Sequence, residues 1–99
     1  MEIFETMEPA LELPSVLDLV AASALLEIFM QHRGRAVRLD ASAVQRLGGQ
    51  CLQVLLAARA AWAADAQSFL IENSSPEFTE SLEFMGVEPA SLSHEKEAA

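Results

Sequence analysis

The sequence predicts a single α/β domain, a small mixed β-sheet of about four strands with helices packed on it. Segments whose apolar residues recur at helical spacing alternate with short β-compatible segments along the chain. The 99 residues suffice for one hydrophobic core, and the apolar share of 52% excludes a disordered body. We expect a lead-in or edge strand over residues 1–9, the domain over 10–87 and a flexible tail over 88–99.

The first half of the domain is predicted to form a strand, a helix and a second strand. Ala10–Leu13 alternates apolar and polar residues before a Pro-Ser turn, which is typical of a short strand. An apolar stripe of helical period follows, with Asp18 as its N-cap and Gly34 just past its last turn. The residues predicted to form this stripe are Leu19, Ala22, Leu25, Leu26, Ile28 and Phe29. Residues 36–39 are again β-compatible, and a turn-prone segment beginning at Asp40 ends them.

The second half predicts a helix, a strand and a third helix. The Gly48-Gly49 pair precedes a helical stripe that reaches about Asp65 and consists of Cys51, Val54, Leu55, Ala58 and Trp62. Gln67–Ile71 is predicted to be a strand. Ser75-Pro76-Glu77 combines an N-cap hydroxyl, a proline at the first helical position and an acidic residue in the first turn. The buried stripe of this helix is predicted to be Phe78, Leu82 and Met85, and Gly86 is expected to end it.

The charge distribution excludes several classes of function. Six basic against 15 acidic residues give a net charge of −9, which repels nucleic-acid phosphates and anionic lipid headgroups. Between Arg33 and Arg59, five Arg against one Asp give +4, so the rest of the chain carries −9 − 4 = −13. One cysteine cannot form an internal disulfide, and no Cys/His cluster has zinc-ligand spacing. With neither a signal peptide nor an apolar stretch of membrane-spanning length, we expect a cytoplasmic protein without metal or cofactor.

Two segments resemble the STAS domain, the fold of anti-sigma factor antagonists and of STAS subunits of several transporters. Leu17–Leu25 is similar to the family's "LD, two residues, TA, two residues, L" sequence at its first helix. Leu39–Val44, followed by Leu47 and Leu52–Leu56, resembles the family's "D-x-S-x-V" strand end and second helix. The resemblance extends from about residue 11 to residue 87. It implies a non-catalytic protein-binding module in a bacterial regulatory or signalling pathway.

The chain departs from antagonist members of this family in the loop before the second helix. That loop reads Asp-Ser-Ser-Gly or Asp-Thr-Ser-Gly in the antagonists, and a partner kinase phosphorylates one of its hydroxyls. Here the four positions are Gly48, Gly49, Gln50 and Cys51. Gln50 occupies the place of the phosphoacceptor, and its amide cannot accept a phosphoryl group. The resemblance therefore implies docking at this surface without phosphorylation there.

The partner-binding surface is predicted at Arg46, Gly48, Gly49, Gln50 and Gln53. Loops after strands, and the helix N-termini beside them, are where open α/β sheets bind ligands. Two glycines expose backbone N–H groups at this point, and Gln50 and Gln53 share a helical face because they are three residues apart. The implied partner is another protein, such as a kinase-type anti-sigma factor or a signalling protein. The sequence leaves the partner's identity and the oligomeric state open.

Two alternative functions remain at this point. The chain could be the STAS subunit of an ABC transporter for lipids of the phospholipid-asymmetry type, with the ABC ATPase as its partner. In a different class, it could be a small enzyme that uses Cys51 or Asp40. We expect Cys51 to be a packing residue, Asp40 to form a turn, and Ser42 and Ser75 to be structural hydroxyls at a turn and a helix cap.

Overall fold

A three-stranded parallel sheet lies at the centre of the computed structural model, which describes residues 10–96. Its strands are β1 (Leu11–Glu12), β3 (Val37–Asp40) and β5 (Phe69–Glu72), in the order β1-β3-β5. A parallel pair of two-residue strands, β2 (Val16–Leu17) and β4 (Arg46–Leu47), forms a second small sheet. The α/β class is confirmed. Residues 10–96 contain five strands, compared with the approximate four of the prediction, and β2 and β4 are the strands that the sequence analysis did not name.

Pairing between the named strands is parallel throughout residues 10–96, whereas a mixed sheet was predicted. The antiparallel contribution is an isolated bridge between Phe69 and His94. Parallel neighbours follow from the connections, since each pair of adjacent strands in the larger sheet is joined through a helix.

The helices lie on one face and at one end of the sheets. α1 (Leu19–Gln31) and α2 (Gly49–Ala64) lie side by side over one face of the central sheet and begin at the same end of the molecule. α3 (Pro76–Phe84) packs against β4, on the other side of that small sheet from α1. The described chain has no helix long and apolar enough to cross a membrane.

α1 and α3 begin at the N-cap residues predicted from the sequence, and each is followed by the predicted glycine. Asp18 caps α1 by accepting a hydrogen bond from a backbone N–H three residues on, at 3.0 Å. The Ser75 hydroxyl does the same for α3, also at 3.0 Å. Gly34 and Gly86 follow these helices with φ of +90° and +82°, a conformation that side chains rarely adopt. α2 begins at Gly49 itself, so the second glycine belongs to the helix.

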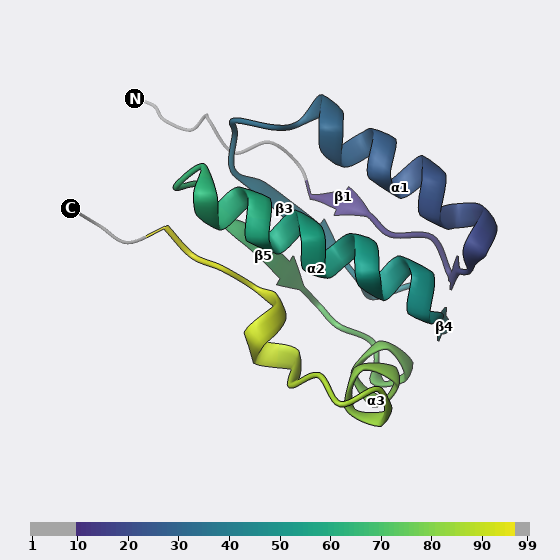
Figure 1. Ribbon diagram of the computed structural model, residues 1–99. Coiled ribbons are helices and arrows are strands. Elements are labelled where there is room, and N and C mark those ends of the chain that lie inside the picture. Colours follow the sequence, from purple (N-terminus) through teal and green to yellow (C-terminus); the bar gives the residue numbers. More distant parts are fainter. Residues whose placement is uncertain (1–9, 97–99) are drawn as a thin grey trace.

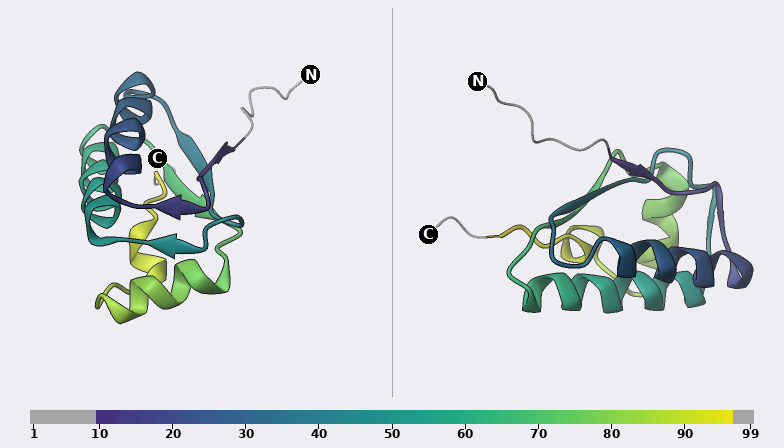
Figure 2. Two further views of the ribbon diagram at one scale, coloured as in Figure 1. Left: turned by 90° about the vertical axis from the view of Figure 1, so that its right-hand side faces the viewer. Right: turned by 90° about the horizontal axis from the view of Figure 1, so that it is seen from above.

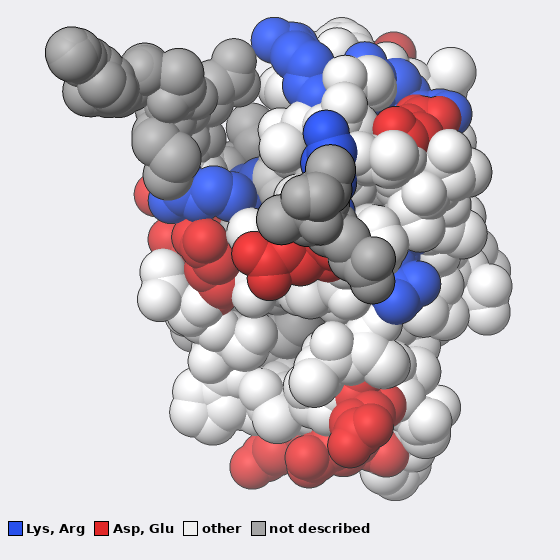
Figure 3. Space-filling model, turned by 90° about the vertical axis from the view of Figure 1, so that its left-hand side faces the viewer, with Lys and Arg blue, Asp and Glu red and all other residues white. Residues whose placement is uncertain are grey.

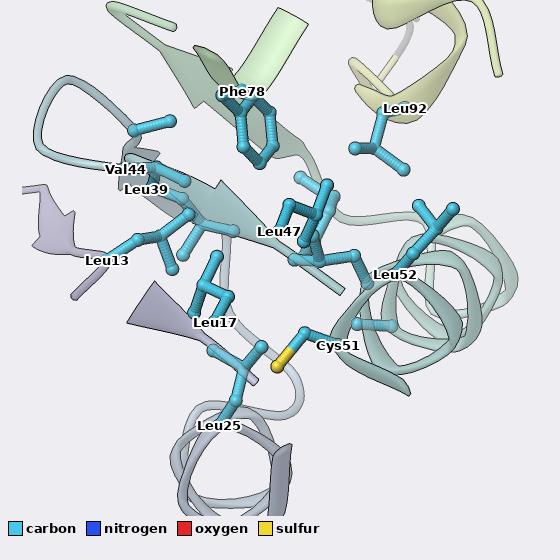
Figure 4. Close-up of a cluster of buried hydrophobic side chains, with 14 of the residues drawn as sticks. Leu13, Leu17, Leu25, Leu39, Val44, Leu47, Cys51, Leu52, Phe78 and Leu92 are labelled. Atoms are coloured by element: carbon cyan, nitrogen blue, oxygen red, sulfur yellow. The ribbon is translucent and has the colours of Figure 1, made fainter. Parts of the chain in front are cut away.

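The buried side chains confirm the predicted buried face of α2 and differ from the prediction for α1. Cys51, Leu55, Ala58 and Trp62 are buried, Val54 is half-buried, and Leu52 joins the buried face; the cluster around Cys51 is shown in Figure 4. On α1 the buried residues are Leu25 and Phe29. The predicted stripe residues Leu19, Leu26 and Ile28 are instead exposed. Apolar residues surround most of α1, so their period alone could not identify the buried face.

The segment after α3 is packed against the domain, contrary to the flexible tail predicted from residue 88. Pro89–Leu92 forms a 3₁₀ turn, and Leu92 is fully buried. His94 and Phe69 exchange two backbone hydrogen bonds, at 2.6 and 2.7 Å. The sequence interpretation missed this because Leu92 is a single apolar residue among polar and small ones. The prediction for residues 1–9 lies outside the described residues.

Candidate partner-binding site

The predicted partner-binding residues gather around the first turn of α2. Gly48 is the N-cap, with extended backbone (φ −95°, ψ 168°). Gly49 and Gln50 form the start of the helix, and Gln53 lies one turn further; all three are exposed. Arg46 is exposed on β4, two residues before the cap. The structure therefore brings all five residues to one end of the molecule.

The two glycines at this end have different surroundings. The Gly48 N–H donates a hydrogen bond to the Leu17 carbonyl oxygen at 2.8 Å, and a Cβ on Gly48 would lie 3.4 Å from that oxygen. Gly48 thus brings the start of α2 against β2. A Cβ on Gly49 would meet nothing within 4 Å. Gly49 therefore leaves open space in which another molecule's backbone can approach α2.

A groove separates the start of α2 from α3. Its volume is about 540 Å³, and its lining residues are Gln45, Leu47, Gly48, Gly49, Glu77, Glu80, Ser81, Phe84 and Met85. Phe84 is 92% exposed although it is a large aromatic residue. Of the five predicted residues, Gly48 and Gly49 line the groove, whereas Arg46, Gln50 and Gln53 lie on the surface outside its lining. The surface thus combines a polar helix face with a partly apolar groove.

The sequence analysis missed the contribution of α3. The buried face of this helix consists of Phe78 and Leu82, with Met85 half-buried. Phe84 falls off that stripe, and this offset was the available signal for an exposed aromatic residue. Glu77 and Glu80 line the groove beside it.

Carboxylates lie in more than one part of the surface. Figure 3 shows one group along the lower edge, where α3 lies, and others higher up, beside Arg and Lys side chains. Within the central stretch, Arg33 pairs with Asp65 at 2.9 Å, and Arg38 pairs with Glu72 at 3.2 Å. The hydrogen bond from Arg33 lowers the pKa of Asp65. The central basic stretch is therefore partly neutralised, and the α3 wall of the groove carries the carboxylates of Glu77 and Glu80.

Cys51 is a buried packing residue. Its side chain is fully buried, its S–H donates to the Asp18 carbonyl oxygen (Sγ to O, 3.2 Å), and its sulfur points into the core towards Leu25. Burial, followed by the negative charge of Asp18, raises the pKa of the thiol above its ordinary value. The side chain is thus held as a thiol, whereas the thiolate is the nucleophilic form.

Asp40 forms the predicted turn at the end of β3. Its carboxylate accepts a hydrogen bond from the Ser42 backbone N–H at 2.9 Å, and this bond lowers the pKa of Asp40. The strand register aligns Asp40 with Glu12 on β1 and Glu72 on β5. Among residues 10–96, no group of three or more His, Cys, Asp or Glu side chains is arranged to hold a metal ion.

The two serines that were expected to be structural hydroxyls differ in accessibility. Ser75 is buried, where its hydroxyl caps α3 and donates to the Val44 carbonyl oxygen. A phosphoryl group on Ser75 would break both contacts. Ser42 is exposed, and its backbone N–H completes the Asp40 turn.

Comparison with known proteins identifies the family. The family model described as "Mlab, STAS domain" matches residues 4–92, which is most of the chain. Neither the curated proteins nor the solved structures give a significant match. The match agrees with the resemblance seen around Leu17–Leu25 and Leu39–Leu56, and with the small parallel sheets and three helices of the fold. The chain therefore belongs to the STAS-domain family.

Proposed function

We propose that this chain is a non-catalytic, anti-sigma factor antagonist-like docking module of a regulatory or signalling pathway in the cytoplasm. STAS domains generally mediate protein–protein interactions, which supports a protein partner. The observation that carries the proposal is the 92% exposed Phe84 beside the open start of α2. A large exposed aromatic residue at the edge of a groove is typical of an interaction site.

Each part of the surface has a physical role in docking. Burial of Phe84 in the complex supplies apolar free energy, because its ring is now in water. Gly49 leaves space for the partner's backbone. Gln50 and Gln53 supply exposed amide donors and acceptors on one helix face. Arg46 adds a positive charge next to the acidic α3.

Docking at this surface needs no phosphoryl group on the first turn of α2. Residues 48–51 contain no hydroxyl, and Gln50 occupies the position of the family's phosphoacceptor. A neutral amide there keeps the same charge whatever kinases are active. We infer a module whose binding is controlled by the abundance or state of its partner.

The enzyme alternative has little physical support. A nucleophilic cysteine needs an accessible thiolate, whereas Cys51 is buried and its pKa is raised. The Asp40 carboxylate is occupied by its own turn.

A second candidate function is the STAS subunit of an ABC transporter for lipids. The description of the matching family model favours it. The same surface would then contact the ABC ATPase. Copurification of the chain with an ATPase and a permease supports this candidate, and copurification with an anti-sigma factor or another signalling protein supports the first.

The test is quantitative copurification of tagged variants from the source cell. Phe84→Glu and Gln53→Glu place a charge at the proposed surface, and we expect the affinity for the recovered partner to fall by more than about tenfold, because the new carboxylate is desolvated without a counter-charge. Gln31→Glu is the matched control, since Gln31 is exposed at the far end of α1. Each variant should keep its stability within about 0.5 kcal/mol of wild type, because each changes an exposed side chain.

The outcomes separate clearly. Loss of the partner by both surface variants, with retention by the control, supports docking at the groove. Full binding by both folded surface variants places the interface elsewhere and contradicts the proposal.

A further inference from the structure

The groove between the start of α2 and α3 has an acidic wall. α3 carries three exposed glutamates, Glu77, Glu80 and Glu83, and no basic residue. Since they follow one another at intervals of three residues, neighbouring carboxylates lie close together on the helix surface and repel each other. Two of them, Glu77 and Glu80, line the groove. A cation bound in the groove would relieve this repulsion.

The lining of the groove changes from charged to apolar along α3. Glu77, Glu80 and Phe84 all line the groove, so they share the face of α3 that is turned towards it. Two helical turns, about 10 Å, separate the backbone of Glu77 from that of Phe84. Met85 adds a second apolar side chain to the lining at the Phe84 end, where Phe84 itself is 92% exposed. The groove therefore has an acidic end and an apolar end in a fixed order.

No basic side chain of the described chain neutralises the acidic end. Within residues 10–96, the ion pairs are those of Arg33 and Arg38, whose partners lie outside α3. Arg46 on the adjacent β4 is exposed and lies outside the groove lining. The opposite wall contributes no charged side chain and consists of Gln45, Leu47, Gly48 and Gly49. The two carboxylates in the groove are thus available to a cation from another molecule.

We propose, on the basis of the docking function proposed above, that the groove binds a basic amphipathic helix of the partner protein. A Lys or Arg of that helix faces Glu77 and Glu80, and a large apolar side chain two turns away packs on Phe84. A helix laid along α3 repeats the two-turn spacing of these groups, because both helices have the same rise per residue. A Cβ on Gly49 would meet nothing within 4 Å, so the opposite wall leaves room for the partner's backbone.

Charge and apolar area together favour this occupant over others. An acidic segment or a nucleic acid would bring further negative charge against Glu77 and Glu80. A second copy of the chain carries −9 and meets the same repulsion. A small cation such as a polyamine pairs with the carboxylates but leaves the ring of Phe84 in water. A segment that carries both a cation and an apolar side chain matches the two ends of the groove.

Two synthetic helical peptides are the probes for this groove. Both are alanine-based and carry a leucine two turns from a pair of charged residues, which are lysines in one peptide and glutamates in the other. In a heteronuclear NMR titration of the whole chain, we expect the lysine peptide to shift the amide signals of residues 45–49 and 77–85. Its affinity should fall as NaCl is added, because salt screens the charge pairing. The glutamate peptide should shift neither segment.

Three variants of the chain test the two ends of the groove. Glu80→Lys replaces attraction by repulsion and is expected to weaken binding of the lysine peptide at least about fivefold. Phe84→Ala is expected to weaken it at every salt concentration, because apolar burial is lost. Glu27→Lys is the matched control, since it makes the same change in net charge at an exposed position of α1 outside the groove lining. It should bind like wild type. Circular dichroism melting verifies that all variants are folded.

Three results overturn the proposal. The first is equal binding of the lysine and glutamate peptides, or equal weakening by Glu80→Lys and Glu27→Lys. The second is a lysine peptide that shifts neither segment at millimolar concentration. In the third, the signals of residues 45–49 and 77–85 move with the concentration of the chain alone, which identifies a second copy as the occupant.

The copurified partner separates this proposal from the docking function itself. Loss of the partner by Glu80→Lys, with retention by Glu27→Lys, supports both. A partner that binds Glu80→Lys as tightly as wild type, but is lost by Phe84→Glu, leaves docking at the groove standing and contradicts the basic helix. A partner that binds Glu80→Lys and Phe84→Glu fully contradicts docking at the groove.

Discussion

Trp62 connects both helices of the main layer to the sheet. Its ring contacts Phe29 of α1 at 5.9 Å and Phe69 of β5 at 5.8 Å between ring centroids. Its indole N–H donates to the Arg35 carbonyl oxygen at 2.6 Å. A buried aromatic residue with these contacts and a satisfied polar atom is part of the core rather than a stacking platform for a ligand.

Trp62→Ala is expected to lower the free energy of unfolding by about 3–5 kcal/mol, since it leaves a large cavity and an unpaired carbonyl. Leu19→Ala is the control: Leu19 is 69% exposed, so its truncation should change the stability by less than about 0.5 kcal/mol. Urea unfolding followed by fluorescence or circular dichroism measures both. Equal destabilisation by Trp62→Ala and Leu19→Ala would mean that Leu19 is buried, as the sequence analysis predicted for the apolar stripe of α1.

Cys51 should react slowly with thiol reagents in the folded protein. Its raised pKa keeps the thiol protonated at neutral pH, and burial denies the reagent access. Because the shift is upward, the thiolate fraction rises only when the pH exceeds the ordinary pKa of cysteine. Alkylation by iodoacetamide with and without denaturant measures this. Rapid alkylation of the native protein at neutral pH would restore the enzyme hypothesis.

At the scale of elements, helices could be predicted and the shortest strands could not. α3 has a cap, a proline at its first position and a terminal glycine in the sequence, and each acts locally. β2 and β4 have two residues each and exist because Val16–Leu17 pairs with Arg46–Leu47. Two residues show no alternation, and their pairing depends on tertiary structure. The prediction of the buried face of α1 was wrong for a related reason. The elements that pack against α1 decide which of its apolar sides is buried.

Ser75→Ala is expected to destabilise the protein by about 0.5–2 kcal/mol, because it removes the cap of α3. The loss should lie towards the upper end, since the Val44 carbonyl oxygen also loses its hydrogen-bond donor. Ser74→Ala, at an exposed neighbouring position, is the control. Thermal melting compares the two. An unchanged melting temperature for Ser75→Ala would contradict the cap assignment.

Part of the proposed docking surface could be predicted from the sequence. Gly48, Gly49 and Gln50 could be placed at a helix start because the segments on both sides of them resemble a family framework. Phe84 was not found because its exposure depends on how α3 is rotated against β4. Whether one aromatic side chain is exposed depends on the tertiary structure of the whole domain.

At the scale of the whole molecule, the segment after α3 contributes a buried side chain, Leu92, to the hydrophobic core. Leu92→Ala is expected to cost about 2–5 kcal/mol, because the side chain is fully buried beside α2 and α3. Glu95→Ala, an exposed change three residues later, should be nearly neutral. Chemical denaturation measures both. A neutral Leu92→Ala would restore the prediction of a flexible tail from residue 88.

Hydrogen–deuterium exchange of the chain, alone and bound to its copurified partner, tests the central claim most directly. Exchange reports which backbone N–H groups the partner covers. The docking proposal predicts that protection on binding concentrates in residues 45–53 and 76–86, around the start of α2 and along α3. Protection confined to other segments, with these two exchanging as in the free chain, would contradict it.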